Sequence, residues 1–165
     1  MGNAPRIAID AMGGDSGPAV MIAGAAAILH IWLAARVSRM RVAHKVSIGD
    51  GGQEPLIRRM RAHANYGESM PIVLIMIGLI ELAGGDARIL WAAGILFILS
   101  RIAHGFGMDQ PHPSRLRAIG MMGTTLVLVG LAGWSLSFAY LQSPPAPHET
   151  MIGPGRTAAS ATPTT

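Results

Sequence analysis

The sequence predicts an all-α protein, an integral membrane four-helix bundle. Of its 165 residues, 50% are hydrophobic and only 13% are charged, which is about half of the roughly 25% charged residues found in soluble domains. Four long apolar segments are each long enough to cross a bilayer. Strands are not expected, because Gly, Ala, Leu, Ile and Met dominate the composition. The chain has no cysteine, which excludes disulfides, cysteine-ligated metal sites and thiol nucleophiles of its own.

The first half of the chain contains two of the expected helices. A segment without formal charge covers residues 16–35, and at about 1.5 Å per residue it spans the roughly 30 Å of bilayer hydrocarbon. We expect a basic connector over residues 36–52. The second helix is expected to begin near Glu54–Pro55, because proline is well tolerated in the first helical turn. It should be kinked at Pro71 and end at Gly84–Gly85.

The second half predicts two more helices. Asp86 is a suitable N-cap for a third helix over residues 87–108. The loop of residues 109–113, with the sequence DQPHP, ends that helix, and Ser114 can cap the fourth. The fourth helix contains a charge-free segment over residues 118–142, again long enough to span a bilayer.

The two ends of the chain differ in composition from the helical part. We therefore divide the chain into a Gly-rich leader (residues 1–15), a four-helix transmembrane domain (residues 16–142) and a Pro/Ala/Thr-rich tail (residues 143–165). The leader and the tail lack an extended apolar pattern, and we expect both to be disordered.

Basic residues gather at one end of the predicted bundle. The positive-inside rule places that end in the cytoplasm and both termini outside it. An even number of spans also requires the two termini to share a side. Ten of the 13 basic residues lie at this end: Arg36, Arg39, Arg41, Lys45, Arg58, Arg59, Arg61, Arg101, Arg115 and Arg117.

Several polar residues fall at or near membrane depth, where an ionisable group is costly unless it faces a protein interior or a wet cavity. On the second helix, intervals of three, four and three residues place four of them on one face: Arg58, Arg61, Asn65 and Glu68. Arg101 and His104 lie one turn apart on the third helix, toward the same end. Guanidinium groups bind carboxylates and Glu68 can bind an ammonium group, so this set could hold a small anionic molecule.

Structural readings of the same residues are equally open. The arginines near the helix ends can anchor the bundle at the membrane surface. Glu68 can form an interhelical ion pair with Arg101 or Arg61, which would satisfy it without a ligand. The histidines and carboxylates have no spacing typical of a metal site, so no metal is expected.

The motifs RMRAHANYGESMP, SRIAHGFGM and RLRAIGM resemble those of the MAPEG family (membrane-associated proteins in eicosanoid and glutathione metabolism). The resemblance covers roughly residues 18–141 and is strongest to the short bacterial branch. It implies a left-handed four-helix bundle that assembles as a homotrimer in the bacterial inner membrane. In enzymatic members, glutathione binds between subunits near the cytosolic face and reacts as a thiolate with lipophilic electrophiles or hydroperoxides.

The resemblance also implies roles for individual residues. Arg117 matches the arginine that stabilises the glutathione thiolate, and a guanidinium favours the charged form of a thiol. The positions that match glutathione contacts are Arg39, Asn65, Glu68 and His104. The positions that match supporting basic groups are Arg58, Arg61 and Arg101. Some positions depart from the glutathione-binding pattern, which has an arginine at Ala64, tyrosines at Met108 and Met121, a serine at Ala118 and a glutamate at Ile57.

A second resemblance is confined to the beginning of the chain. RIAIDAMGGDSGPAVMIAGAA is similar to the N-terminus of bacterial phosphate acyltransferase, a soluble α/β enzyme about twice as long. Nothing after residue 27 continues the match. We interpret the resemblance as that of a fused or mis-started leader.

Two functions from different classes follow. One is a glutathione-dependent transferase or peroxidase acting on lipophilic electrophiles, with Arg117 as the catalytic residue. The other is a non-catalytic trimeric membrane or lipid-binding module in which the polar residues form a structural network. The expected partners are membrane lipid, a lipophilic small molecule and further copies of the chain; no nucleic acid is expected.

Overall fold

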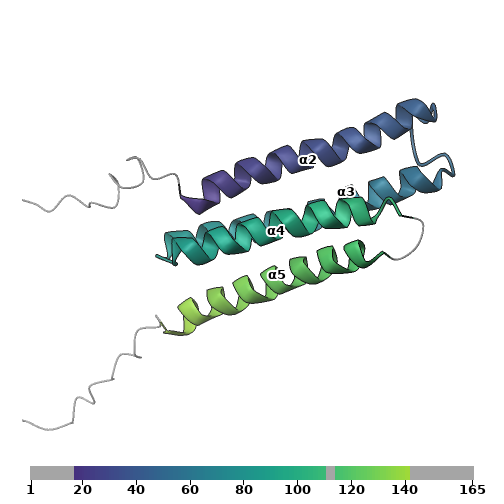
Figure 1. The fold of residues 1–165 in the computed structure, drawn as a ribbon. Coiled ribbons are helices and arrows are strands. Elements are labelled where there is room, and N and C mark those ends of the chain that lie inside the picture. The colour runs from purple at the N-terminus through teal and green to yellow at the C-terminus, as the bar shows by residue number, and fades with distance from the viewer. Residues whose placement is uncertain (1–16, 111–113, 142–165) are drawn as a thin grey trace, which may run out of the picture.

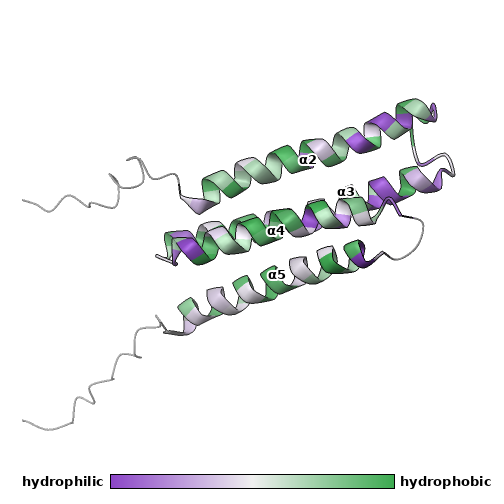
Figure 2. Cartoon of the chain, viewed as in Figure 1, coloured by the Kyte–Doolittle hydropathy of each residue, from purple (hydrophilic) through white to green (hydrophobic). Residues whose placement is uncertain are grey.

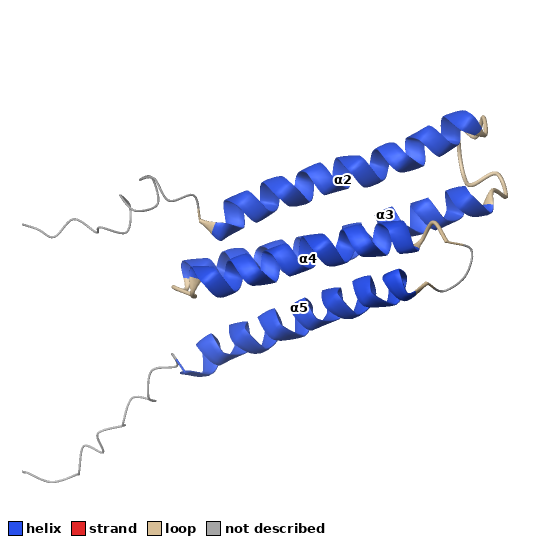
Figure 3. Ribbon diagram, viewed as in Figure 1, coloured by secondary structure: helices blue, strands red, loops and turns tan. Residues whose placement is uncertain are grey.

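The structure is a computed structural model that describes residues 17–110 and 114–141. These ranges contain four helices and no strand (Figure 3). The helices are α2 (Pro18–Ala43), α3 (Glu54–Leu82), α4 (Ala87–Gly107) and α5 (Arg115–Leu141) (Figure 1). Each is long and apolar enough to cross a membrane. The predicted all-α class with four membrane-spanning helices is therefore confirmed, whereas the trimer stays a prediction.

Successive helices run antiparallel along a common axis (Figure 1). α2 packs against α3 and α4, and α5 packs against α4 and α3. Within the described ranges α2 and α5 are not adjacent in the bundle. The C-terminal ends of α2 and α4 therefore meet the N-terminal ends of α3 and α5. We call this the basic end, because it contains the ten basic residues named above, and it is the most hydrophilic part of the described chain (Figure 2).

Apolar side chains line both the inside and the outside of the bundle. The buried core includes Ile22 of α2, Ile77 of α3, Phe97 of α4 and Leu131 of α5. Large apolar side chains also point outward on every helix, such as Ile28, which is 71% exposed. Outward apolar faces on all four helices suit a bilayer, where hydrocarbon replaces water as the surrounding medium.

The helix boundaries agree with the sequence except at one place. Asp86 caps α4 as predicted, its carboxylate accepting from the backbone N–H groups of Arg88 and Ile89. Ser114 caps α5 by accepting from the backbone N–H of Arg117, 3.2 Å away. α3 is continuous through Pro71, and the predicted kink there stays a prediction. The leader (residues 1–15) and the tail (residues 143–165) lie outside the described residues.

The prediction that residues 36–52 form a connector was partly wrong. α2 continues to Ala43, so only residues 44–53 connect it to α3. The charges that suggested a loop are accommodated on the helix, because Arg36 forms an ion pair with Asp109 of the distant α4 corner. A contact across 73 residues of sequence is invisible in local composition.

Glycines let α4 and α5 approach closely at the basic end. A Cβ atom at Gly120 would lie 2.6 Å from the backbone of both Ser100 and His104. A Cβ atom at Gly107 would collide with the backbone of Arg117. Such close backbone contact is typical of small residues at helix interfaces in membranes. It brings the start of α5 directly against the last turns of α4.

Candidate functional site

A cavity of about 230 Å³ opens between three helices at the basic end. α3 provides four of its lining residues, α5 provides two, and the other two are His104 of α4 and Met108, which directly follows α4. The lining residues are Arg61, Ala64, Asn65, Glu68, His104, Met108, Arg117 and Met121.

Five of the six site residues predicted from the sequence meet around this cavity: Arg61, Asn65, Glu68, His104 and Arg117. The sixth, Arg39, does not. It is exposed on α2, a helix that contributes nothing to the lining. Three of the positions that depart from the glutathione-binding pattern, Ala64, Met108 and Met121, do line the cavity, so its walls are partly apolar.

The cavity arises from two features of the sequence. The intervals of four and three residues on α3 place Arg61, Asn65 and Glu68 on one face. The glycine contacts between α4 and α5 then bring His104 and Arg117 opposite that face. Side chains separated by up to 56 residues in the chain are thereby gathered at one site.

The buried side chain of Arg101 holds one of the cavity residues, Asn65, in position. Arg101 is 1% exposed, and its Nη2 donates to Oδ1 of Asn65 over 2.7 Å. Its Nη1 donates to Oγ1 of Thr124 on α5 over 3.4 Å, and its guanidinium lies 5.9 Å from the centre of the Tyr66 ring. These contacts join α3, α4 and α5 and orient the Asn65 carboxamide. Neither Tyr66 nor Thr124 was singled out from the sequence.

The predicted ion pair of Glu68 with Arg101 or Arg61 does not form. In the part of the chain that the structure describes, no ion pair involves Glu68. Arg101 bonds to Asn65 instead. Glu68 and Arg61 are both exposed at the cavity, where their charges are free to interact with a ligand.

His104 adds a second buried polar group to the wall. It is 4% exposed, and its Nδ1 has no hydrogen-bond partner among the described residues. Because this Nδ1 is itself enclosed by protein, it leaves an unsatisfied hydrogen-bonding group inside the wall of the cavity. With Arg61, Arg117 and the underlying Arg101 against the single carboxylate of Glu68, the cavity carries an excess of positive charge.

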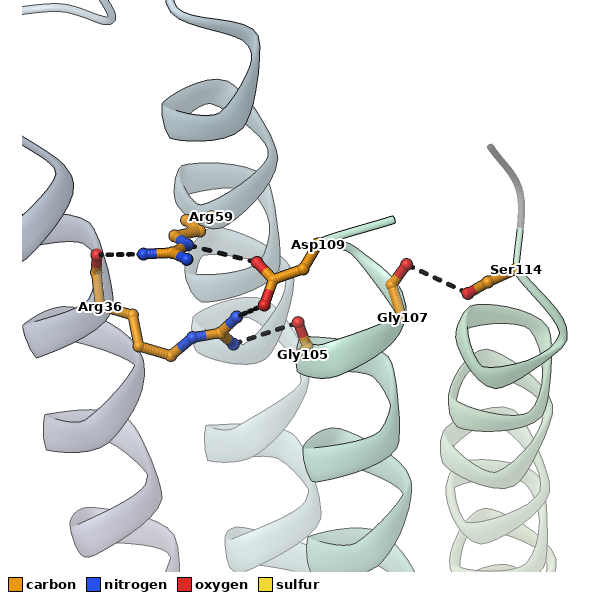
Figure 4. Close-up of polar contacts among 6 residues, drawn as sticks. All are labelled: Arg36, Arg59, Gly105, Gly107, Asp109 and Ser114. Carbon is orange, nitrogen blue, oxygen red and sulfur yellow. Dashed lines mark hydrogen bonds and ion pairs between the residues drawn. The ribbon is translucent and has the colours of Figure 1, made fainter. Parts of the chain in front are cut away.

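An ionic cluster fixes the α4 corner beside the cavity (Figure 4). Asp109, which directly follows the cavity residue Met108, forms ion pairs with Arg36 of α2 and, over 3.2 Å, with Arg59 of α3. Arg36 also donates to the carbonyl of Gly105 over 3.1 Å. Through these contacts the cluster connects the ends of α2, α3 and α4.

Ser114 links that corner to the start of α5. Its hydroxyl donates to the carbonyl of Gly107 over 3.1 Å (Figure 4) and accepts from the backbone N–H of Arg117. The capping interaction therefore sets where α5 begins relative to α4. Because Arg117 lies in the first turn of α5, its position at the cavity depends on this contact.

Two histidines meet away from the cavity. The Nε2 atoms of His30 on α2 and His63 on α3 lie 3.4 Å apart. No group of three or more residues able to hold a metal occurs among residues 17–110 and 114–141.

Comparison with known proteins identifies the family to which this sequence belongs. The model of the MAPEG family matches residues 19–137, which include all four helices up to the last turn of α5. The chain belongs to the MAPEG family. It is 31% identical over 110 residues to the inner membrane protein YecN of Escherichia coli K12 and of Escherichia coli O6:H1. Each match covers 62% of this chain and 83% of the relative.

The arrangement in this MAPEG member can bind and orient a small anion. Two exposed guanidinium groups can each hold a carboxylate or stabilise a developing negative charge. The Glu68 carboxylate can hold an ammonium group, and the Asn65 amide can bond to a peptide. The apolar surfaces of Met108 and Met121 leave room for a lipophilic group beside the polar ones.

Proposed function

We propose that the cavity at the basic end binds glutathione and presents it to a lipophilic electrophile or hydroperoxide. The observation that carries the proposal is the meeting of Arg61, Glu68 and Arg117 around one cavity, although they lie on two different helices. Glutathione supplies the thiol that a chain without cysteine lacks. The protein then acts as a glutathione-dependent transferase or peroxidase.

The polar side chains around the cavity match the charges of glutathione, which has two carboxylates, one ammonium group and two amides. Arg61 and Arg117 complement negative charge, Glu68 complements the ammonium group, and Asn65 complements an amide. Arg117 is the catalytic candidate, since a guanidinium near a thiol favours the thiolate, which is the nucleophilic form. Burial of Arg101 and its bond to Asn65 keep that carboxamide in place.

The size of the cavity supports a proposal about assembly. Pockets for small molecules usually measure roughly 300–1,000 Å³, so the 230 Å³ formed by one protomer is small for a tripeptide. We infer that a second copy in a homotrimer supplies the remaining wall. The name of the relative, inner membrane protein YecN, supports a location in the bacterial inner membrane. The positive-inside rule places the cavity on the cytoplasmic side.

Calorimetry on the purified protein in detergent tests the proposal. We expect glutathione to bind at millimolar or lower concentration, and conjugation of chlorodinitrobenzene to depend on it. Arg117→Ala should reduce conjugation by roughly 100-fold or more, the usual loss when one group that stabilises charge is removed. Arg88→Ala, which removes an exposed arginine from the opposite end, is the control. Absence of binding at millimolar glutathione would overturn the proposal.

A second candidate function is a non-catalytic trimeric membrane module. It is favoured by the apolar lining residues Ala64, Met108 and Met121, which offer no hydrogen bonds to a peptide. The double variant Glu68→Gln/Arg117→Ala separates the two functions. Loss of glutathione binding with an unchanged oligomer supports the enzyme, whereas dissociation or unfolding of the oligomer supports the structural module.

A further inference from the structure

A second hollow lies at the corner between α2 and α3, apart from the cavity described above. Its volume is about 500 Å³, and none of its residues lines the candidate glutathione site. Two are basic and two carry hydroxyls, and the others are apolar. The lining residues are Ser38, Arg41, Val42, Lys45, Val46 and Ser47.

Arg41 is held in place within this hollow. Its Nη1 donates to the carbonyl of Ser47 over 3.2 Å, and its Nη2 lies 3.7 Å from the sulfur of Met60 on α3. A guanidinium carries five N–H donors, so these contacts leave further donors available. The arginine is thus oriented by the protein but retains donors for an oxyanion.

Lys45 occupies a backbone position that normally suits glycine. The bonds from the N–H of Val46 to the carbonyl of Arg41, and from the N–H of Lys45 to the carbonyl of Val42, form a Schellman motif at the end of α2. Lys45 has a φ of +53° at the left-handed position of this motif. α3 ends with the same pair of bonds and has Gly84 there, with a φ of +82°. A lysine at such a position is less favourable for the backbone than a glycine.

The cations of the hollow have no acidic partner. Within the described residues, no ion pair involves Arg41 or Lys45. Asp50 is the one carboxylate of the adjoining connection, residues 44–53, and it accepts from the backbone N–H of Gly52 over 2.9 Å. The hollow therefore presents two positive charges to whatever lies outside it.

Exposed apolar residues surround and continue the hollow. Val42 is 79% exposed and Ile48 is 90% exposed, beside the basic groups. Ile28, Ile31, Ser38 and Val42 are three, seven and four residues apart, which places them on one face of α2. Ser38 lies ten residues from Ile28, about 15 Å along the helix. That is half of the roughly 30 Å of bilayer hydrocarbon, or the depth of one leaflet.

We propose that this hollow binds the phosphate group of an anionic phospholipid. Arg41 and Lys45 hold the phosphate, the hydroxyls of Ser38 and Ser47 contact the headgroup, and one acyl chain follows Ile31 and Ile28 along α2. Basic pockets at the ends of membrane helices bind anionic headgroups through the same combination of charge and apolar surface. The proposal is independent of glutathione binding, since the two sites share no residue.

Native mass spectrometry and thermal unfolding of the delipidated protein in neutral detergent test the proposal. We expect dioleoylphosphatidylglycerol to bind and stabilise the protein more strongly than dioleoylphosphatidylcholine. Arg41→Gln/Lys45→Gln should lower affinity for the anionic lipid roughly 30-fold, since each cation contributes about fivefold. The control Arg58→Gln/Arg115→Gln removes two cations from the same end outside the hollow and should leave the affinity nearly unchanged.

Two results of these measurements would overturn the proposal. One is an equal loss of affinity in both double variants, which would mean that only the total charge of the basic end matters. The other is equal stabilisation by millimolar inorganic phosphate, which would assign the hollow to a soluble anion.

The variant Lys45→Gly separates binding from folding. Glycine suits the left-handed position, so the lipid-free protein should melt at the same or a higher temperature. Its affinity for dioleoylphosphatidylglycerol should nevertheless fall about fivefold. A lower melting temperature without a loss of lipid affinity would show that Lys45 is structural, and would contradict the proposal.

Discussion

The two ends of the bundle place polar groups in different ways. At the basic end, Arg36 and Arg101 are buried and are bonded between helices, to Asp109 and Asn65. At the opposite end the most buried residues are apolar, such as Ile80 and Leu90, and the part-buried Glu81 accepts from the backbone N–H of Ala19 at the start of α2. Buried guanidinium groups thus connect the helices at the basic end, whereas at the other end a part-buried carboxylate of α3 connects to α2 by capping its N-terminus.

This difference follows from how a bundle in a membrane is stabilised. Lipid is as apolar as a leucine side chain, so packing and hydrogen bonds, rather than exclusion of water, hold such helices together. Buried charge is retained only where partners satisfy it. The basic end therefore combines rigid support with an open polar cavity, which is the combination that a binding site requires. Three comparisons between variants test whether the two ends differ in this way.

The largest effect is expected from Arg101→Ala. It removes a side chain that is 1% exposed and leaves Oδ1 of Asn65 without its donor. We expect the free energy of unfolding to fall by about 3–5 kcal/mol, together with loss of ligand binding at the cavity. Reversible unfolding in mixed micelles, followed by circular dichroism, measures the change.

Leu90→Ala provides the matched control at the opposite end. Leu90 is fully buried, and its truncation should cost about 2–3 kcal/mol without altering ligand affinity at the cavity. If Leu90→Ala weakened ligand binding as much as Arg101→Ala, the two ends would not be separable.

The second comparison is between two glycines in the two halves of α5. Gly120→Ala places a methyl group 2.6 Å from the backbone of α4, which must force the helices apart at a cost of about 1–3 kcal/mol. Gly130→Ala, further along α5, meets nothing within 4 Å and should be neutral, or stabilising by up to about 1 kcal/mol through helix propensity. Unfolding of the two variants under identical conditions makes the comparison. Equal effects would show that α4 and α5 are not packed more tightly at the basic end.

Much of the fold could be predicted because its signals are local. Charge-free segments of 20 or more residues indicated the first and the fourth span. Asp86 and Ser114 were recognised as caps because their bonds reach only a few residues along the chain. The end of α2 was predicted several residues too early, because the charge of Arg36 suggested a loop. Its partner Asp109 lies far away in the sequence and comes close only in the folded chain.

The candidate site was predictable only in part, for the same reason. The spacing of Arg61, Asn65 and Glu68 follows from helical periodicity. Which of them accepts from Arg101 depends on the rotation and depth of α4 relative to α3, and the sequence left Glu68 as the candidate acceptor. The position of Arg39 was taken from family resemblance, and within one protomer it lies outside the cavity.

The third comparison has the smallest effects and begins with Glu81→Ala at the end opposite the cavity. The carboxylate of Glu81 lies 2.8 Å from the backbone N–H of Ala19, where α2 has no side-chain cap of its own. Its loss leaves a helical N–H group unsatisfied and removes a negative charge from the positive end of the helix dipole. We therefore expect a destabilisation of about 1 kcal/mol, seen as a lower melting temperature and faster hydrogen exchange over residues 18–22. Glu81→Gln, which keeps an acceptor, should lose about half as much.

The matched acidic residue at the basic end is Glu54, whose exposed pair with Arg58 spans 2.9 Å. Glu54→Ala should cost only about 0.3–0.5 kcal/mol, since an exposed pair one helical turn apart contributes little. Neither variant should change ligand affinity at the cavity. A larger loss for Glu54→Ala than for Glu81→Ala would mean that Glu81 does not cap α2. The polar groups at the two ends would then differ in number but not in role.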